Sequence, residues 1–350
     1  MPSAKNAGGI SILRRNFIMM DYTMFKELVN DKFKDYLPDH MKNGEVKILQ
    51  INKTNGTKDG LNVYQPDSNV APTLYVDDMY EHFKESQDFE GVLREAADRY
   101  VAAMENIPEM PKDILTDSSK GKIYMTLINT EANRSMLEKV PHREVNDTSV
   151  IYRLMISDDD RGIGSTVITN ELAENLGFSE EELFKIAVEN TPKLFPPVVK
   201  PMSQVIFGML TENGGMPKDV AEQVVDGMKG ENEMMWIITN SKGISGAVNM
   251  IFEKNLFELS KGLGDDLYIL PSSIHEVIAV PSSLGDPEEL ASMVQEVNMS
   301  VVDVSERLSN QVYHYNRDSR KLSMATDTPS KDIVNAVAEI SLVYDTEPKR

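Results

Sequence analysis

Apolar side chains recur at helical spacing in two stretches near the start of the chain. In the first stretch, five of them fall on one face at the i, i+3, i+4 spacing: Phe25, Leu28, Val29, Phe33 and Tyr36. This spacing predicts a helix over residues 21–37 that Pro38 ends. A similar stripe predicts a second helix over residues 88–105, followed by a linker at Pro108 and Pro111.

Between these two helices the pattern changes to short runs with strand character. Residues 45–51 and 61–65 flank Asn55-Gly56, a dipeptide typical of hairpins, and the connection is predicted to be longer than two residues. A third strand is predicted at 73–76. The N-terminal part therefore reads as a small α-β-β-β-α unit.

In the second half of the chain most predicted strands come in consecutive pairs. They lie at residues 123–128, 148–156, 163–169, 234–239, 266–270, 274–280, 311–315 and 321–325. No alternating βαβ pattern at nucleotide-binding spacing occurs. Paired strands of this kind favour antiparallel sheets built from hairpins with flanking helices, which is an α+β fold with a larger mixed C-terminal domain.

Helix signals in the second half begin with a capping box formed by Ser179 and Glu182, which predicts a helix through Asn190. The prolines from Pro192 to Pro201 then predict a stiff, extended segment. Asp286-Pro287 starts another predicted helix, with a cap followed by proline at the first helical position. Its expected buried face consists of Leu290, Met293, Val294 and Val297.

An amphipathic helix is predicted from Met202 to Leu210, and glycines bracket the segment after it. Gly214-Gly215 and Gly230 enclose a short apolar-striped helix, so residues 216–230 are interpreted as an inserted helix and a candidate lid.

Composition shifts divide the chain into four parts. Residues 1–19 are predicted to be a disordered or non-native extension, 20–117 the N-terminal unit, 118–325 the main domain, and 326–350 a linker with a C-terminal helix. Arg14-Arg15 lacks the apolar run that an export signal needs. The C-terminal helix is expected to dock on the body, with partner binding as the alternative.

Charge and cysteine content exclude several classes of protein. The chain has 36 Lys+Arg and 56 Asp+Glu, a net charge of −20, and no cysteine. Disulfides, cysteine-ligated metals and thiol nucleophiles are therefore absent. The acidity argues against nucleic-acid binding, which needs clustered basic residues. Without a long apolar run the protein is expected to be cytoplasmic and off the membrane, with no metal or cofactor predicted and the oligomeric state open.

Three short motifs favour structural readings over chemistry. Gly162-Ile163-Gly164 precedes a strand, so it indicates a hairpin turn and not a phosphate cradle. Asp158 to Asp160 could ligate a hard cation, but a solvated turn is favoured. Asp77-Asp78 could bind a divalent metal, although capping of a helix N-terminus is the simpler reading.

The densest group of reactive side chains is Ser273, His275 and Glu276, in a segment expected to be a strand. Alternation would place Ser273 and His275 on one face and Glu276 on the other. Even on the same face, Ser273 and His275 would be too far apart to form a nucleophile–base pair unless the strand bends. His275 could act as a base or metal ligand with Asp265 or Asp266, or be a hydrogen-bonded structural histidine. His142, placed in a loop, is a weaker candidate.

Three segments together are similar to a known family: Ala71–Tyr75, Asn190–Pro197 and Asp266–Ile278. The chain resembles a bacterial family of unknown function, met mainly in anaerobic Gram-positive gut bacteria, over residues 22–324. The second half more distantly resembles another Gram-positive family of unknown function. Neither resemblance implies an activity, a cofactor or a catalytic residue, but the first supports a start at Met19 or Met20.

Three functions follow from these patterns. The favoured hypothesis is a protein-binding or regulatory protein without catalysis, whose acidic surface would complement basic partners. The alternative is a hydrolase-type enzyme with a site around His275, where Ser273 and Glu276 are the other candidates. Direct nucleic-acid binding is the least favoured.

Overall fold

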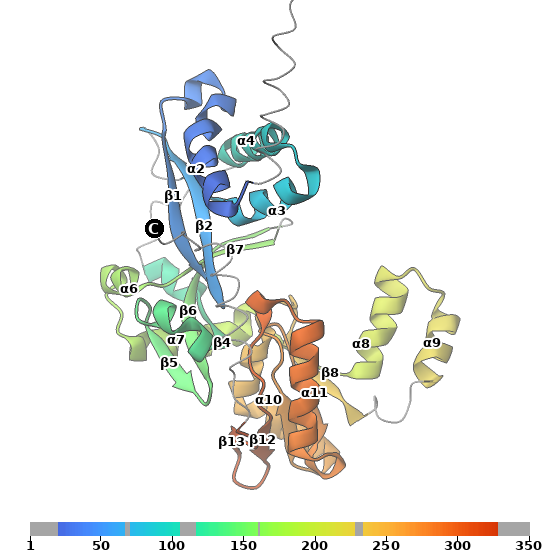
Figure 1. The fold of residues 1–350 in the computed structure, drawn as a ribbon. Helices are drawn as coiled ribbons and strands as arrows, with labels where there is room; N and C mark the ends of the chain where they lie inside the picture. The colour runs from blue at the N-terminus through green and yellow to red at the C-terminus, as the bar shows by residue number, and fades with distance from the viewer. Residues whose placement is uncertain (1–19, 67–70, 106–116, 160–161, 228–233, 328–350) are drawn as a thin grey trace, which may run out of the picture. The chain divides into compact units, whose positions relative to one another are not determined.

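The computed structural model describes residues 20–66, 71–105, 117–159, 162–227 and 234–327, which fall into two compact units (Figure 1). Unit 1 holds residues 20–105 and unit 2 holds residues 117–327. Both combine antiparallel sheets with flanking helices, so the predicted α+β class is confirmed. The predicted extension at 1–19 and the C-terminal helix at 329–344 lie outside the described residues.

Unit 1 begins with helix α2 (Tyr22–Lys32), continued by a 3-10 turn. Asp21 caps this helix by accepting the Met24 N–H at 2.8 Å. Strands β1 (Glu45–Lys53) and β2 (Gly56–Tyr64) pair antiparallel, and β3 (Leu74–Tyr75) adds to β2.

The hairpin between β1 and β2 corrects the predicted long connection. Lys53 pairs directly with Gly56, which leaves a loop of only Thr54 and Asn55. Asn55 has φ of 56°, a left-handed conformation that asparagine tolerates better than most residues. Because the loop is so short, the hydrogen-bonded pairing of β1 and β2 continues up to the turn, and both strands are longer than predicted.

Two helices, not one, close unit 1: α3 (Val76–Ser86) and α4 (Phe89–Glu105). The prediction omitted α3, so the unit is α-β-β-β-α-α. The core is aromatic-rich, and its largest fully buried side chains include Phe25, Phe33, Phe83 and Tyr100. The Tyr100 hydroxyl donates to the carbonyl of Val63 at 2.8 Å, which satisfies the polar end of this buried ring.

Unit 2 contains a four-stranded sheet centred on the long strand β6 (Thr148–Asp159). Strand β4 (Ile123–Asn129) pairs along one edge of β6, while β5 (His142–Val145) and β7 (Gly162–Val167) share the other edge. His142 therefore opens a strand. Its placement in a loop was wrong, since β5 has only four residues and no clear alternation.

The second sheet of unit 2 has six strands in the order β13-β12-β10-β11-β9-β8, all antiparallel. Its strands are β8 (Pro197–Pro201), β9 (Trp236–Asn240), β10 (Leu267–Leu270), β11 (Val277–Pro281), β12 (Tyr313–Asn316) and β13 (Lys321–Met324). The proline-rich β8 is an edge strand, where a residue without an N–H disturbs the ladder least.

The described helices of unit 2 are α5 (Arg134–Leu137), α6 (Asn170–Leu176), α7 (Glu180–Leu194), α8 (Met202–Gly208), α9 (Lys218–Gly227), α10 (Glu253–Leu263) and α11 (Pro287–Ser300). The capping box of Ser179 and Glu182 is confirmed. Helix α7 runs past Asn190 and includes Pro192, which corrects the predicted extended segment there. Helices α5, α6 and α10 were not predicted.

The main core of unit 2 joins apolar residues of both sheets with those of α7 and α10. A smaller cluster lies between α11 and the six-stranded sheet. The face of α11 differs from the prediction: Leu290 and Val294 are buried, whereas Met293 and Val297 are 49% and 41% exposed. Ala291 and Asn298 are buried together with Leu290 and Val294. The buried face of α11 is therefore shifted from the predicted face by about one residue position around the helix.

In the part of the chain that the structure describes, every helix is too short or too polar to cross a membrane.

Candidate functional site

The segment with Ser273, His275 and Glu276 is an irregular loop before β11, not part of the predicted strand. The His275 N–H donates to the Ser273 hydroxyl at 3.0 Å, which closes a local turn. Ser273 is buried and also makes an isolated bridge to Arg307. The expected alternation of faces is therefore absent, and the Ser273 hydroxyl accepts the His275 N–H and also hydrogen-bonds to the Glu276 carboxylate.

Both ring nitrogens of His275 are engaged. Nδ1 accepts the backbone N–H of Ser245 at 3.2 Å, and Nε2 lies 3.2 Å from Oε1 of Glu306. A nitrogen that accepts an N–H carries no proton, so the neutral ring has its proton on Nε2, which faces the Glu306 carboxylate. This arrangement leaves His275 no nitrogen to activate a hydroxyl or a water.

The backbone around His275 ties the same loops together. Thr239 donates its hydroxyl to the His275 carbonyl at 2.8 Å, and the Ala247 N–H donates to the Ile274 carbonyl at 3.2 Å. Gly246 is packed so closely that an added Cβ would lie 2.5 Å from the His275 carbonyl oxygen. His275 therefore lies at a junction of three segments and supports their packing.

The acid beside His275 is not one of those expected from the sequence. Asp265 accepts hydrogen bonds from Ser282 and Ser283, and Asp266 accepts them from Asn316 and Arg317. Glu306 takes the position beside the imidazole instead.

Glu276 lies next to this junction in a partly buried position. Burial raises the pKa of its carboxyl above the usual range, a change that His275 opposes and Glu306 reinforces. A raised pKa alone does not make an acid catalyst, because neither ring nitrogen of His275 is free to share a proton with it.

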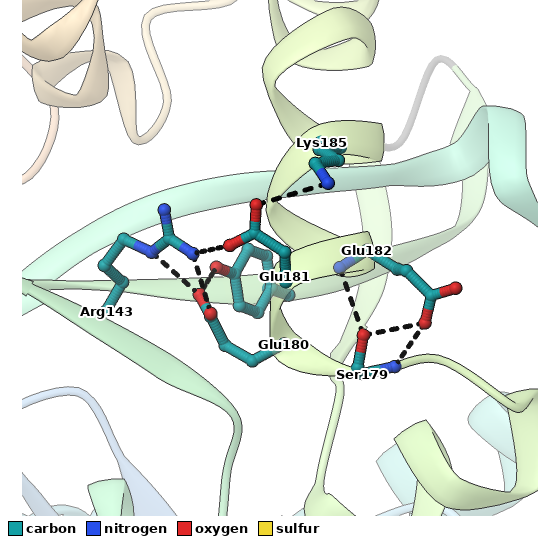
Figure 2. A network of polar contacts seen from close by, with 7 residues as sticks. Arg143, Ser179, Glu180, Glu181, Glu182 and Lys185 are labelled. Atoms are coloured by element: carbon teal, nitrogen blue, oxygen red, sulfur yellow. Dashed lines mark hydrogen bonds and ion pairs between the residues drawn. The ribbon is translucent and has the colours of Figure 1, made fainter.

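A second polar group gathers where β5, β6 and α7 meet (Figure 2). Arg143 on β5 donates to both oxygens of Glu180, at 3.1 and 2.8 Å, and to Glu181 at 2.7 Å. Its guanidinium also lies 3.9 Å from the ring centre of Phe184. The buried Tyr152 of β6 donates its hydroxyl to Glu180.

Each charge in this group stabilises another. The hydrogen bonds that Arg143 donates to Glu180 and Glu181 raise the pKa of its guanidinium, so the guanidinium stays charged. Burial raises the pKa of Tyr152, and its hydrogen bond to Glu180 raises it further, so the phenol stays protonated. No pattern in the sequence distinguishes Arg143 from the other arginines of the chain. Its partners on α7 are 37 and 38 residues away in sequence.

The two acidic motifs singled out as cation candidates have protein partners among their described residues, and Asp160 lies outside the described residues. Asp158 forms an ion pair with Lys242 at 2.9 Å, and Asp77 accepts the Asp59 N–H at 2.8 Å. Asp77 and Asp78 lie in the first turn of α3, at a helix N-terminus as expected, although the N-cap residue is Tyr75 and no side chain caps it. Within the described ranges no group of three potential metal ligands comes together.

Helices α8 and α9 form a separate feature of unit 2, which we call the helical arm (residues 202–227). The two helices follow β8 and precede β9 in the chain, and they contact each other, with a π-helical turn at Met209–Asn213 after α8 (Figure 1). Although α8 is strongly apolar, none of its residues is buried. Met209 is 58% exposed, and Val220 and Val224 on α9 are 42% and 37% exposed.

The fold and these contacts define an antiparallel α+β protein. In it both ring nitrogens of His275 contact protein groups, and apolar side chains of the helical arm are exposed. The chain belongs to a family of unknown function, DUF5688, which it matches over residues 22–317. The resemblance seen in the sequence is thereby confirmed, while the expected distribution of that family stays a prediction. Searches of curated proteins and of solved structures found no match to the chain.

Proposed function

We propose that the protein is a non-catalytic binding protein whose helical arm takes a basic, amphipathic segment of a partner protein in the cytoplasm. The observation that carries this proposal is the exposure of Met209, Val220 and Val224 on the helical arm, in which α8 is mostly apolar and α9 is amphipathic. Contiguous apolar surface on a soluble protein is costly to leave in water and commonly marks an interaction site.

The charge of the arm specifies the chemistry of the partner. Residues 202–227 contain four acidic side chains and one basic side chain, Lys218. The acidic residues are Glu212, Asp219, Glu222 and Asp226. A segment with apolar residues on one face and Lys or Arg beside them would bury its apolar face and complement these carboxylates.

The contacts of His275 favour binding over hydrolysis. A hydrolase needs a nitrogen that can take a proton from a nucleophile, and both nitrogens of His275 are occupied by Ser245 and Glu306. The hydroxyl of Ser273 accepts the His275 N–H instead of lying against the ring.

The test is fluorescence anisotropy with a labelled Leu/Lys peptide of about 18 residues, designed as an amphipathic helix. We expect a Kd of about 10 μM at about 0.15 M salt, weakened several-fold at about 0.5 M salt. Met209→Gln should weaken binding about tenfold, because burying the exposed part of this methionine contributes about 1.4 kcal/mol.

Met24→Gln is the matched control, since Met24 on α2 of unit 1 is 48% exposed and lies outside the arm. A second control peptide replaces every Lys with Glu and should not bind. Equal losses in Met209→Gln and Met24→Gln, or equal binding of both peptides, would overturn the proposal. Both substitutions are at exposed positions, so both variants should fold.

A further inference from the structure

A cleft of about 480 Å³ lies beside the Arg143–Glu180 group of unit 2. Its walls are apolar, formed by Val140, Pro141, Ala173 and Phe178. Its polar lining consists of His142, Asn170, Glu174 and Glu180, from β5, α6 and α7. Such a combination of apolar walls and a few polar groups is typical of small-ligand sites.

The hydrogen bonds of the lining leave mainly acceptors toward a ligand. His142 donates from Nδ1 to the Val140 carbonyl at 3.0 Å, which keeps Nε2 of the neutral ring unprotonated. Asn170 donates from Nδ2 to the Glu138 carbonyl at 3.2 Å, so its side-chain oxygen remains an acceptor. Glu174 is exposed and forms no ion pair among the described residues.

Glu180 lines the cleft but adds no unpaired charge, because Arg143 neutralises its carboxylate. Its carboxylate is fixed by Arg143 and Tyr152, as Figure 2 shows for the arginine. The Lys120 ammonium lies 5.4 Å from the centre of the adjacent Phe178 ring, so the negative charge that attracts a cation to this cleft must come from Glu174.

We infer that this cleft binds a protonated primary amine carried on an apolar body. The ammonium group has three donors and no acceptor, which matches Nε2 of His142, the Asn170 oxygen and the Glu174 carboxylate. The apolar body would cover Val140, Pro141 and Phe178. The amine has two natural sources, a free small molecule or the N-terminus of a peptide.

The test uses 2-phenylethylamine as the free amine and Phe-Gly-Gly as the peptide amine. Binding is followed through the imidazole signals of the five histidines by NMR, with His142→Gln used to assign the His142 signal. We expect a saturable shift of the His142 signal with a Kd of about 1 mM for at least one probe. The tighter probe identifies the source.

Glu174→Gln should weaken binding about fivefold, as expected for a partly exposed charge pair. Glu171→Gln is the matched control on the same helix, outside the cleft lining, and should leave the Kd unchanged. Neutral 2-phenylethanol and N-acetylated Phe-Gly-Gly should not shift His142. The inference is overturned if no probe gives a saturable shift, if the neutral analogues bind equally, or if both Glu variants behave alike.

Discussion

His275 and His142 lie in the same unit and have opposite hydrogen-bonding states. His275 has Nδ1 on the Ser245 N–H and Nε2 on Glu306, whereas His142 has only its Nδ1 engaged, with the Val140 carbonyl. A histidine with both nitrogens used holds loops together, and one with a free nitrogen can receive a ligand's proton donor. Reactive neighbours in sequence are therefore a poorer guide to a site than unfilled hydrogen-bonding capacity.

The largest expected effect comes from crowding the His275 junction. Gly246→Ala should lower the free energy of unfolding of unit 2 by about 3 kcal/mol, because the new Cβ would meet the His275 oxygen at 2.5 Å and the Asn240 nitrogen at 2.9 Å. Urea unfolding followed by the fluorescence of Trp236, the one tryptophan in the chain, measures it.

Gly262→Ala is the control for this experiment. Gly262 lies in α10 with no atom near its added Cβ, so alanine should stabilise the helix by up to about 1 kcal/mol. Destabilisation of similar size in both variants would show that the His275 junction is not specially packed.

A smaller loss is expected when the His275 ring itself is removed. His275→Ala leaves the Ser245 N–H without its acceptor and should lower the unfolding free energy by about 1–2 kcal/mol. The same Trp236 assay measures it. If stability is unchanged while a hydrolytic activity is lost, the junction is a catalytic site and the comparison with His142 fails.

Glu276→Gln tests the charge beside the junction through its pH dependence. Because the folded-state pKa of Glu276 is raised, its contribution to stability is present below the unfolded pKa of about 4.3 and is lost as pH rises through the folded value. Gln should therefore stabilise by less than about 1 kcal/mol at about pH 7, after solvent screening, and by nothing at about pH 4. Urea midpoints at the two pH values measure this, and a pH-independent change would contradict the assigned cause.

The smallest effect is expected at the other histidine. His142→Gln should change the unfolding free energy by less than about 0.5 kcal/mol, since the ring lies at a cleft and holds one hydrogen bond. A loss as large as that of His275→Ala would mean that His142 is also structural.

Much of the fold could be predicted because several helices begin with a local sequence signal. Asp21, Ser179 and Asp286 accept N–H groups at the starts of α2, α7 and α11, and each of those helices was predicted. Helix α6 was missed although Thr169 caps it, because its seven residues are too few to show a periodic apolar stripe. Helices α3 and α10, which were also missed, begin after Tyr75 and Phe252 without a side-chain cap. Their starts depend on tertiary packing, which leaves no local signal.

The candidate site could be predicted only in part, for a related reason. Ser273, His275 and Glu276 were found because they are neighbours in sequence. The residues that decide what His275 does, Ser245 and Glu306, come from other loops. Equally, nothing near His142 in sequence indicates α6 or α7, which complete its cleft. Such contacts follow from the strand order.

Methionine methyl NMR tests most directly whether the helical arm binds basic amphipathic segments. With ¹³C-methyl methionine and the Leu/Lys peptide, the Met209 signal, assigned with Met209→Gln, should shift saturably, while the Met24 signal of unit 1 stays in place. Met24 is comparably exposed, so it reports non-specific binding. Saturable movement of Met209 alone supports the account. No movement, or equal movement of both signals, would contradict it.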